Sequence, residues 1–154
     1  MNESLNISLA AILLVATATA SRAAETKVKL ADLPAPVAKT VKQQSQGAKL
    51  KRVVKDVEGR VTTYEAELTV AGRAKDVTID PDGTVTEVEE EVPLSTLPAA
   101  AKAAIEKAAE GGKLLRVEAI SHNGPVEVYE AEIKKGSKKT ETRVDPAGNP
   151  APKP

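Results

Sequence analysis

The stretch Tyr64-Glu65-Ala66-Glu67-Leu68 returns as Tyr129-Glu130-Ala131-Glu132-Ile133. Both copies alternate an apolar side chain with a carboxylate, which is the pattern of a strand with one buried and one open face. Around this stretch, Leu33-Pro34-Ala35 returns as Leu97-Pro98-Ala99, and Ile79-Asp80-Pro81-Asp82-Gly83 returns as Val144-Asp145-Pro146-Ala147-Gly148. Matches along the whole unit indicate a tandem duplication.

Each unit begins with a helix signal and continues with strands. Pro34 and Pro98 suit the first turn of a helix, and apolar residues recur after them at helical spacing. Strands are predicted at 49–57, 64–70, 75–80, 84–91, 113–120, 129–134 and 140–145, with a bulge in the first strand of each unit. The sequence therefore predicts an α+β fold of two tandem repeats, each one helix packed on a three- to four-stranded antiparallel sheet. Because a unit of roughly 60 residues buries only a marginal core, we expect the halves to share an interface or a sheet.

The N-terminal residues differ in composition from the rest of the chain. Residues 7–20 form an apolar run too short to span a bilayer comfortably, and the small residues Ser21 and Ala23 follow it. We expect a secretory signal peptide at 1–23 and a periplasmic or secreted protein. No Lys or Arg precedes the run, so a buried N-terminal helix and a retained anchor are the alternatives. The first repeat is then expected at 24–92, the second at 93–149, and a disordered proline-rich tail that cannot pair in a sheet at 150–154.

Composition excludes several classes of function. The 22 basic and 22 acidic residues give a formal net charge of zero, so the chain as a whole has no attraction for nucleic acid or an anionic membrane. The chain has no Cys, which excludes disulfides, thiol nucleophiles and metal–thiolate sites. We expect a monomer that, after signal cleavage, binds neither nucleic acid nor a membrane.

The repeated motifs carry a family resemblance. The Leu-Pro helix, the strand reading Tyr-Glu-Ala-Glu and the Asp-Pro-Asp-Gly turn resemble the PepSY-like domains of secreted bacterial proteins. Their tandem arrangement is similar to that of the beta-lactamase inhibitory protein, and the resemblance covers residues 33–149. It implies a helix-backed antiparallel sheet exported to the cell envelope, and a binding or inhibitory role in place of catalysis.

Two groups of residues are candidates for a chemical site. His122 is the only histidine and lies in a predicted turn, where no second His or Cys could join it in a metal or catalytic site. Glu87, Glu89, Glu90 and Glu91 form a dense acidic run downstream of Asp80 and Asp82. An EF-hand needs oxygen ligands at fixed positions around a central Gly, and the stretch Asp80-Pro81-Asp82-Gly83-Thr84 supplies too few, with a proline in the way. We interpret them as a tight turn and a charged edge strand. No catalytic triad or phosphate-binding loop is present, so the sequence predicts no enzyme, no cofactor and no metal site.

The two faces of the repeated strand are expected to play different roles. Tyr64 and Tyr129, the only aromatic residues, alternate with small and aliphatic residues and are predicted to lie in the core. On the other face lie the candidate binding residues Glu65, Glu67, Glu130 and Glu132, although a merely solvated face is the simpler interpretation.

Together these features predict a secreted, non-enzymatic module that binds a protein or peptide in the cell envelope, with inhibition of a peptidase or other enzyme as one form of such binding. The alternatives are a small-ligand or divalent-cation-binding envelope protein using Asp80, Asp82 and the acidic strand, and a purely structural scaffold.

Overall fold

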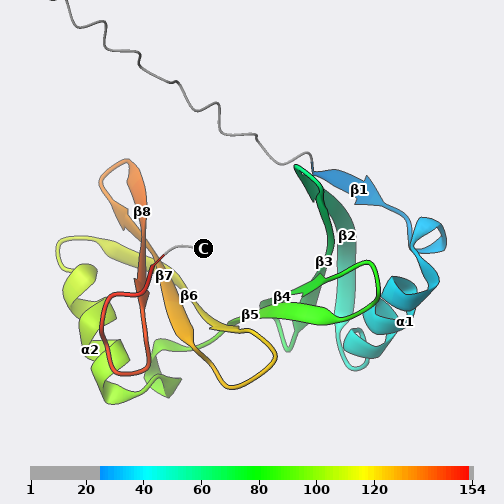
Figure 1. The fold of residues 1–154 in the computed structure, drawn as a ribbon. Coiled ribbons are helices and arrows are strands. Elements are labelled where there is room, and N and C mark those ends of the chain that lie inside the picture. The colour runs from blue at the N-terminus through cyan, green and yellow to red at the C-terminus, as the bar shows by residue number, and fades with distance from the viewer. Residues whose placement is uncertain (1–24, 153–154) are drawn as a thin grey trace, which may run out of the picture.

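The computed structural model describes residues 25–152, so the predicted signal peptide lies outside the described residues. Eight strands form one antiparallel sheet in chain order (Figure 1). The strands are β1 (Thr26–Val28), β2 (Lys49–Glu58), β3 (Val61–Val70), β4 (Arg73–Ile79), β5 (Val85–Glu91), β6 (Lys113–Ser121), β7 (Val128–Lys135) and β8 (Lys138–Val144). Helix α1 (Ala35–Gln44) precedes β2 and helix α2 (Ala99–Ala108) precedes β6, each after a short 3-10 turn. No helix within the described range is long and apolar enough to cross a membrane.

The predicted fold of two tandem helix-on-sheet repeats is wrong, because the strands of both halves belong to one sheet. β5 pairs with β6 from Val88 opposite Ser121 to Glu91 opposite Glu118. The acidic strand β5 is therefore an interior strand and not the charged edge expected from its sequence. The pairing is tolerated because the alternate acidic residues of β5 point away from the helices, while Val88 packs against the core. A shared sheet is one of the two arrangements expected for units too small to hold a core alone.

Both helices pack on one face of the sheet through the predicted apolar stripes. In α1, Val37 and Val41 are 0% and 1% exposed, and Ile105 of α2 is 0% exposed. Their partners are inward-facing strand residues, which form one cluster with α1 (Val53, Tyr64, Ala66, Leu68, Val77, Ile79) and a second with α2 (Val117, Ala131, Ile133, Val144). Fully burying an aliphatic side chain contributes about 1.5–3 kcal/mol, so these two clusters fix which face of the sheet is covered.

The predicted bulges are confirmed in the first long strand of each half. The register shifts between Leu50 and Arg52 in β2 and between Leu114 and Arg116 in β6. After the bulge in β2, Arg52 lies opposite Glu67, on the face away from the helices. The bulges thus place an arginine on that face in each half.

The C-terminal segment departs from the prediction of an unpaired tail. Pro150 forms a bridge with Val144, and the Ala151 N–H donates a hydrogen bond of 3.0 Å to the Arg143 carbonyl. The pairing uses the Ala151 donor, so the N–H that proline lacks is not needed. Residues 150–151 therefore continue the edge of the sheet beside β8.

The sheet is strongly curved, and its two ends rise on the side away from α1 and α2 (Figure 1). We call this uncovered side the open face. The helices occupy the outer side of each arm of the sheet. The open face is therefore the concave one, and it presents side chains from strands of both halves to the same space.

Candidate functional site

The four predicted binding residues all lie on the open face. Glu65 and Glu67 of β3 alternate with the buried Ala66 and Leu68, and Glu130 and Glu132 of β7 alternate in the same way with buried residues. The structure does not bring the two pairs into direct contact, because β4, β5 and β6 lie between them. Whether they bind a partner remains a prediction.

The intervening strands carry further carboxylates that join the two pairs into one row. In the ladder, Glu67 lies opposite Asp76, and Asp76 lies opposite Glu89. Glu91 lies opposite Glu118, so Glu89 is diagonal to Glu118, which in turn lies opposite Glu130. We call Glu67, Asp76, Glu89, Glu118 and Glu130 the carboxylate row. It runs across the open face with one member on each strand from β3 to β7.

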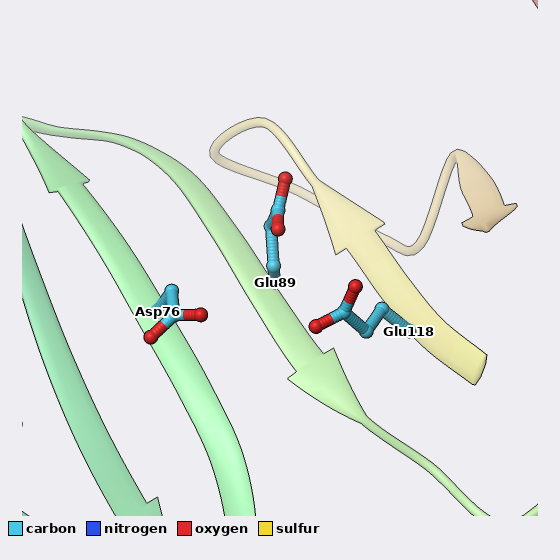
Figure 2. A group of neighbouring side chains, drawn as sticks. All are labelled: Asp76, Glu89 and Glu118. Carbon is cyan, nitrogen blue, oxygen red and sulfur yellow. The ribbon is translucent and has the colours of Figure 1, made fainter. Parts of the chain in front are cut away.

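The centre of the row is its most crowded part. Figure 2 shows Asp76, Glu89 and Glu118 projecting from three neighbouring strands on the same side of the sheet. One carboxylate oxygen from each lies within 4.8 Å of the others. The Glu118 side chain is only 5% exposed, so its carboxylate, when ionised, is almost entirely withdrawn from water. Like charges so close on adjacent strands oppose folding.

Arginines pair with both ends of the row and with Glu118 at its centre, but not with Asp76 or Glu89. Arg52 forms an ion pair with Glu67, and Arg143 Nη1 lies 3.0 Å from Glu130 Oε2. Arg116 Nη2 lies 3.2 Å from Glu118 Oε2. The half-buried carboxylates of Glu65, Asp76 and Glu89 form no ion pair with any residue in the described part of the chain.

This environment favours the protonated form of the central carboxyl groups. Burial raises the pKa of Glu89 to about 7, with further contributions from Glu87 and Glu118. Burial, followed by the charges of Asp76 and Glu67, raises the pKa of Glu65 to about 7. Burial also raises the pKa of Asp76 and the pKa of Glu118, and the charge of Arg116 partly offsets both shifts. The open face therefore gains negative charge as the pH rises through neutrality.

The Asp80–Gly83 turn does not take part in this cluster. Thr40 Oγ1 donates a hydrogen bond of 2.7 Å to the Gly83 carbonyl, which ties the turn to α1. The Thr84 N–H donates a hydrogen bond of 2.9 Å to Asp82 Oδ1, and this contact lowers the Asp82 pKa. The turn thus has a structural role, and a cation site combining Asp80, Asp82 and the acidic strand is not supported.

The remaining predicted residues divide between core and surface. His122 is exposed as expected, and its Nε2 and Nδ1 atoms lie 2.9 Å from Glu87 Oε2 and 3.3 Å from Glu127 Oε2. Tyr64 is 7% exposed, which confirms its core position. Tyr129 is only partly buried and packs against the second cluster, so it is not the fully buried counterpart of Tyr64.

Sequence reasoning missed Asp76 and Glu118 as members of the site. Each alternates with buried valines, Asp76 with Val77 and Glu118 with Val117, so their face could have been inferred from strand periodicity. Their position in a row depends on strand register, which no local pattern reveals.

The comparisons with known proteins support the fold. No family model matches the sequence, and no curated protein matches it. A candidate periplasmic protein of Bacteroides eggerthii has a TM-score of 0.63 at 17% identity, over 77% of this chain and 85% of that one. A BLIP-like protein of Bacteroides fragilis has a TM-score of 0.56 at 20% identity, over 75% and 81%. A DUF2874 family protein of Bacteroides uniformis has a TM-score of 0.60 at 17% identity, over 76% and 85%.

At these identities the likeness concerns the fold. The chain has the fold of the BLIP-like and DUF2874 structures. Membership of the PepSY-like family, expected from the Leu-Pro helix and the Tyr-Glu-Ala-Glu strand, stays a prediction.

Proposed function

We propose that this chain is an exported, non-enzymatic binding module whose open face receives a protein or peptide partner in the bacterial cell envelope. The observation that carries the proposal is the carboxylate row on a sheet face that neither helix covers. The candidate periplasmic protein of the same fold supports the location, as does the apolar N-terminal run.

The energetics of the open face favour a binding role over a merely solvated surface. Like charges placed directly opposite each other on adjacent strands destabilise a sheet by roughly 0.2–1 kcal/mol. Asp76 and Glu89 are such a pair, and both are partly withdrawn from water. A loss of folding stability that the fold itself does not require is typical of a surface that binds a partner.

The breadth of the row favours a macromolecule over a small ligand. Its members span strands β3 to β7, whereas hollows of about 570 and 560 Å³ lie elsewhere, at the N-terminal end of the sheet around Leu30 and Leu50. A small molecule would contact only part of the row.

A divalent cation at Asp76, Glu89 and Glu118 is the alternative, because their oxygens converge within 4.8 Å. Ca²⁺ takes six to eight oxygen ligands, and the one converging oxygen from each carboxylate supplies three of them. Arg116 also places a positive charge beside Glu118, which opposes cation binding. A Ca²⁺ titration followed by melting temperature separates the two functions, because a ligand that binds only the native state must raise that temperature.

The proposal is tested by capture from periplasmic extract on the immobilised protein, identified by mass spectrometry. The open-face variant Glu65→Lys/Glu132→Lys is compared with Glu106→Lys/Glu110→Lys, a matched charge reversal at exposed residues on and just after α2. The open-face variant should lose a partner that the wild type and the helix variant both retain. Equal capture by all three proteins would refute the open face as the binding surface. Assaying any captured enzyme with and without this protein tests inhibition.

A further inference from the structure

We propose that the partner docks through a cationic segment, an extended stretch of protein whose Lys and Arg side chains lie across the carboxylate row. This inference rests on the proposed function, since it specifies the chemistry of the partner that the open face receives.

The local charge of the open face favours a cationic partner. The chain has a formal net charge of zero, so attraction of a cation must come from a local concentration of carboxylates. The arginines at the two ends of the row already pair with Glu67 and Glu130. Three carboxylates without an ion pair, Glu65, Asp76 and Glu89, lie on the neighbouring strands β3, β4 and β5.

The spacing of the carboxylate row suits an extended segment. Adjacent strands lie about 4.8 Å apart, so neighbouring members of the row are close enough to share one guanidinium or ammonium group. In an extended partner segment, alternate side chains point the same way and recur about every 7 Å. A segment with basic residues at alternate positions can therefore place successive cations along the row.

The same charge distribution argues against other macromolecules. Nucleic acid and anionic membrane surfaces would be repelled by the centre of the open face. The concave curvature instead suits a convex or extended protein segment (Figure 1). Arg52, Arg116 and Arg143 each form an ion pair with a glutamate of the row. Because their charges are already paired, these arginines do not attract an anionic ligand.

Cation binding on this face should be linked to proton release. Glu89 is surrounded by Asp76 from β4, Glu87 on its own strand, Glu118 from β6 and Glu130 from β7. Glu65 meets Glu67 on its own strand, Asp76 from β4 and Glu25 near the N-terminal end of the sheet, with Arg52 of β2 opposing them. A cationic segment binds the ionised forms, so its affinity should increase as the pH rises through about 7, where Glu65 and Glu89 ionise.

The inference is tested by calorimetric titration with a synthetic peptide of alternating Arg and Ser, with Gln-Ser and Glu-Ser peptides of equal length as controls. Measurements at about pH 5.5 and 8 use near-physiological salt, so that distant charges are screened. The variant Asp76→Asn/Glu89→Gln removes two charges from the open face. The matched variant Glu106→Gln/Glu110→Gln removes two exposed charges at α2 on the opposite side of the sheet.

The Arg-Ser peptide should bind the wild type more tightly at pH 8 than at pH 5.5, and neither control peptide should bind. Asp76→Asn/Glu89→Gln should weaken its binding about tenfold or more, while the helix variant binds like the wild type. Equal affinity for the Gln-Ser peptide, no binding of the Arg-Ser peptide, or no effect of Asp76→Asn/Glu89→Gln would overturn the cationic partner.

These outcomes are distinct from failure of the proposed function. A partner captured from extract that is lost by Glu65→Lys/Glu132→Lys but retained by Asp76→Asn/Glu89→Gln would overturn the cationic segment and leave the open face as the binding surface. A partner retained by both open-face variants would refute the proposed function itself.

Discussion

Asp76 and Glu89 lie directly opposite each other in the β4–β5 ladder, and neither carboxylate forms an ion pair with a described residue. Register places these like charges in the middle of the sheet, where the strand backbones allow little separation. The face that we propose for binding is therefore also a face that destabilises the free protein.

Replacing Asp76 with Asn should stabilise the free protein at pH 8, by about 0.5–1 kcal/mol, because it removes a like-charge neighbour of Glu89. The gain should be smaller at pH 5, where both raised pKa values leave more of the pair protonated. Urea denaturation of wild type and Asp76→Asn measures this difference in unfolding free energy at each pH, with Glu106→Gln on α2 as the control. A less stable Asp76→Asn protein at pH 8 would show that the carboxylate makes a net favourable contact.

The stability of the wild type should fall as the pH rises from 5 to 8. Glu65 and Glu89 have pKa values of about 7 in the folded protein, against 4.5 in an unfolded chain. Between pH 4.5 and 7 the folded state binds more protons than the unfolded state. The stability that the two protonated carboxyl groups contribute below pH 4.5 is therefore lost as the pH rises through 7. We expect a loss of at least about 1 kcal/mol, since one pKa unit corresponds to about 1.4 kcal/mol.

Denaturant midpoints at a series of pH values measure this slope, and Glu65→Gln/Glu89→Gln should flatten it. Asp82 and Asp145 have lowered pKa values, so their contribution is present above pH 3.8 and lost only at more acidic pH, outside this window. A stability that rises between pH 5 and 8 would contradict the raised pKa values of the open face.

Truncating the two tyrosines should have unequal effects. Tyr64→Ala should destabilise by about 2–4 kcal/mol, because the ring of Tyr64 is buried beside Ala66 and Ile79 and its loss leaves a cavity. Tyr129 is only partly buried, so Tyr129→Ala should cost about half as much. Tyr64→Phe is the control that keeps the ring. Equal losses in unfolding free energy would mean that the two rings are equally buried in solution.

The turn after β4 should tolerate no side chain at Gly83. Gly83 has φ +89°, and an added Cβ would lie 2.9 Å from the Pro36 carbonyl carbon of α1. Gly83→Ala should therefore cost more than about 2 kcal/mol, through backbone strain and displacement of the helix. Gly59 is the matched control: its φ is +61° but nothing lies within 4 Å of an added Cβ. Gly59→Ala should cost only about 1–2 kcal/mol, and denaturation midpoints compare the two.

Local patterns predicted the elements and the faces of the strands. The alternation in Tyr64-Glu65-Ala66-Glu67-Leu68 separated the core face from the open face, because side chains of a strand alternate strictly. The Leu-Pro sequences preceded both helices, and the irregular alternation in residues 49–57 corresponds to a real bulge. These features depend on neighbours close in sequence.

Long-range pairing could not be predicted in the same way. The acidic strand β5 has the composition of an edge, yet it pairs with β6: Glu87, Glu89 and Glu91 share the open face, and Glu90 on the other face forms an ion pair with Lys75. Asp76 and Glu118 became neighbours of Glu89 only through the registers of three strands. β1 has only three residues, too few to show a period, and it was not predicted.

The pairing of β5 with β6 also bears on how the duplicated chain came to be one protein. A lone ancestral unit with a free strand at this position could pair with a second copy only at sufficient concentration. Fusion replaces that encounter with a tether, and the effective concentration of the second unit then no longer depends on expression. Once the units are joined, the two outer edges of the sheet need not match, and they differ here: the three-residue strand β1 forms one edge, whereas Pro150 bridges to Val144 of β8 at the other.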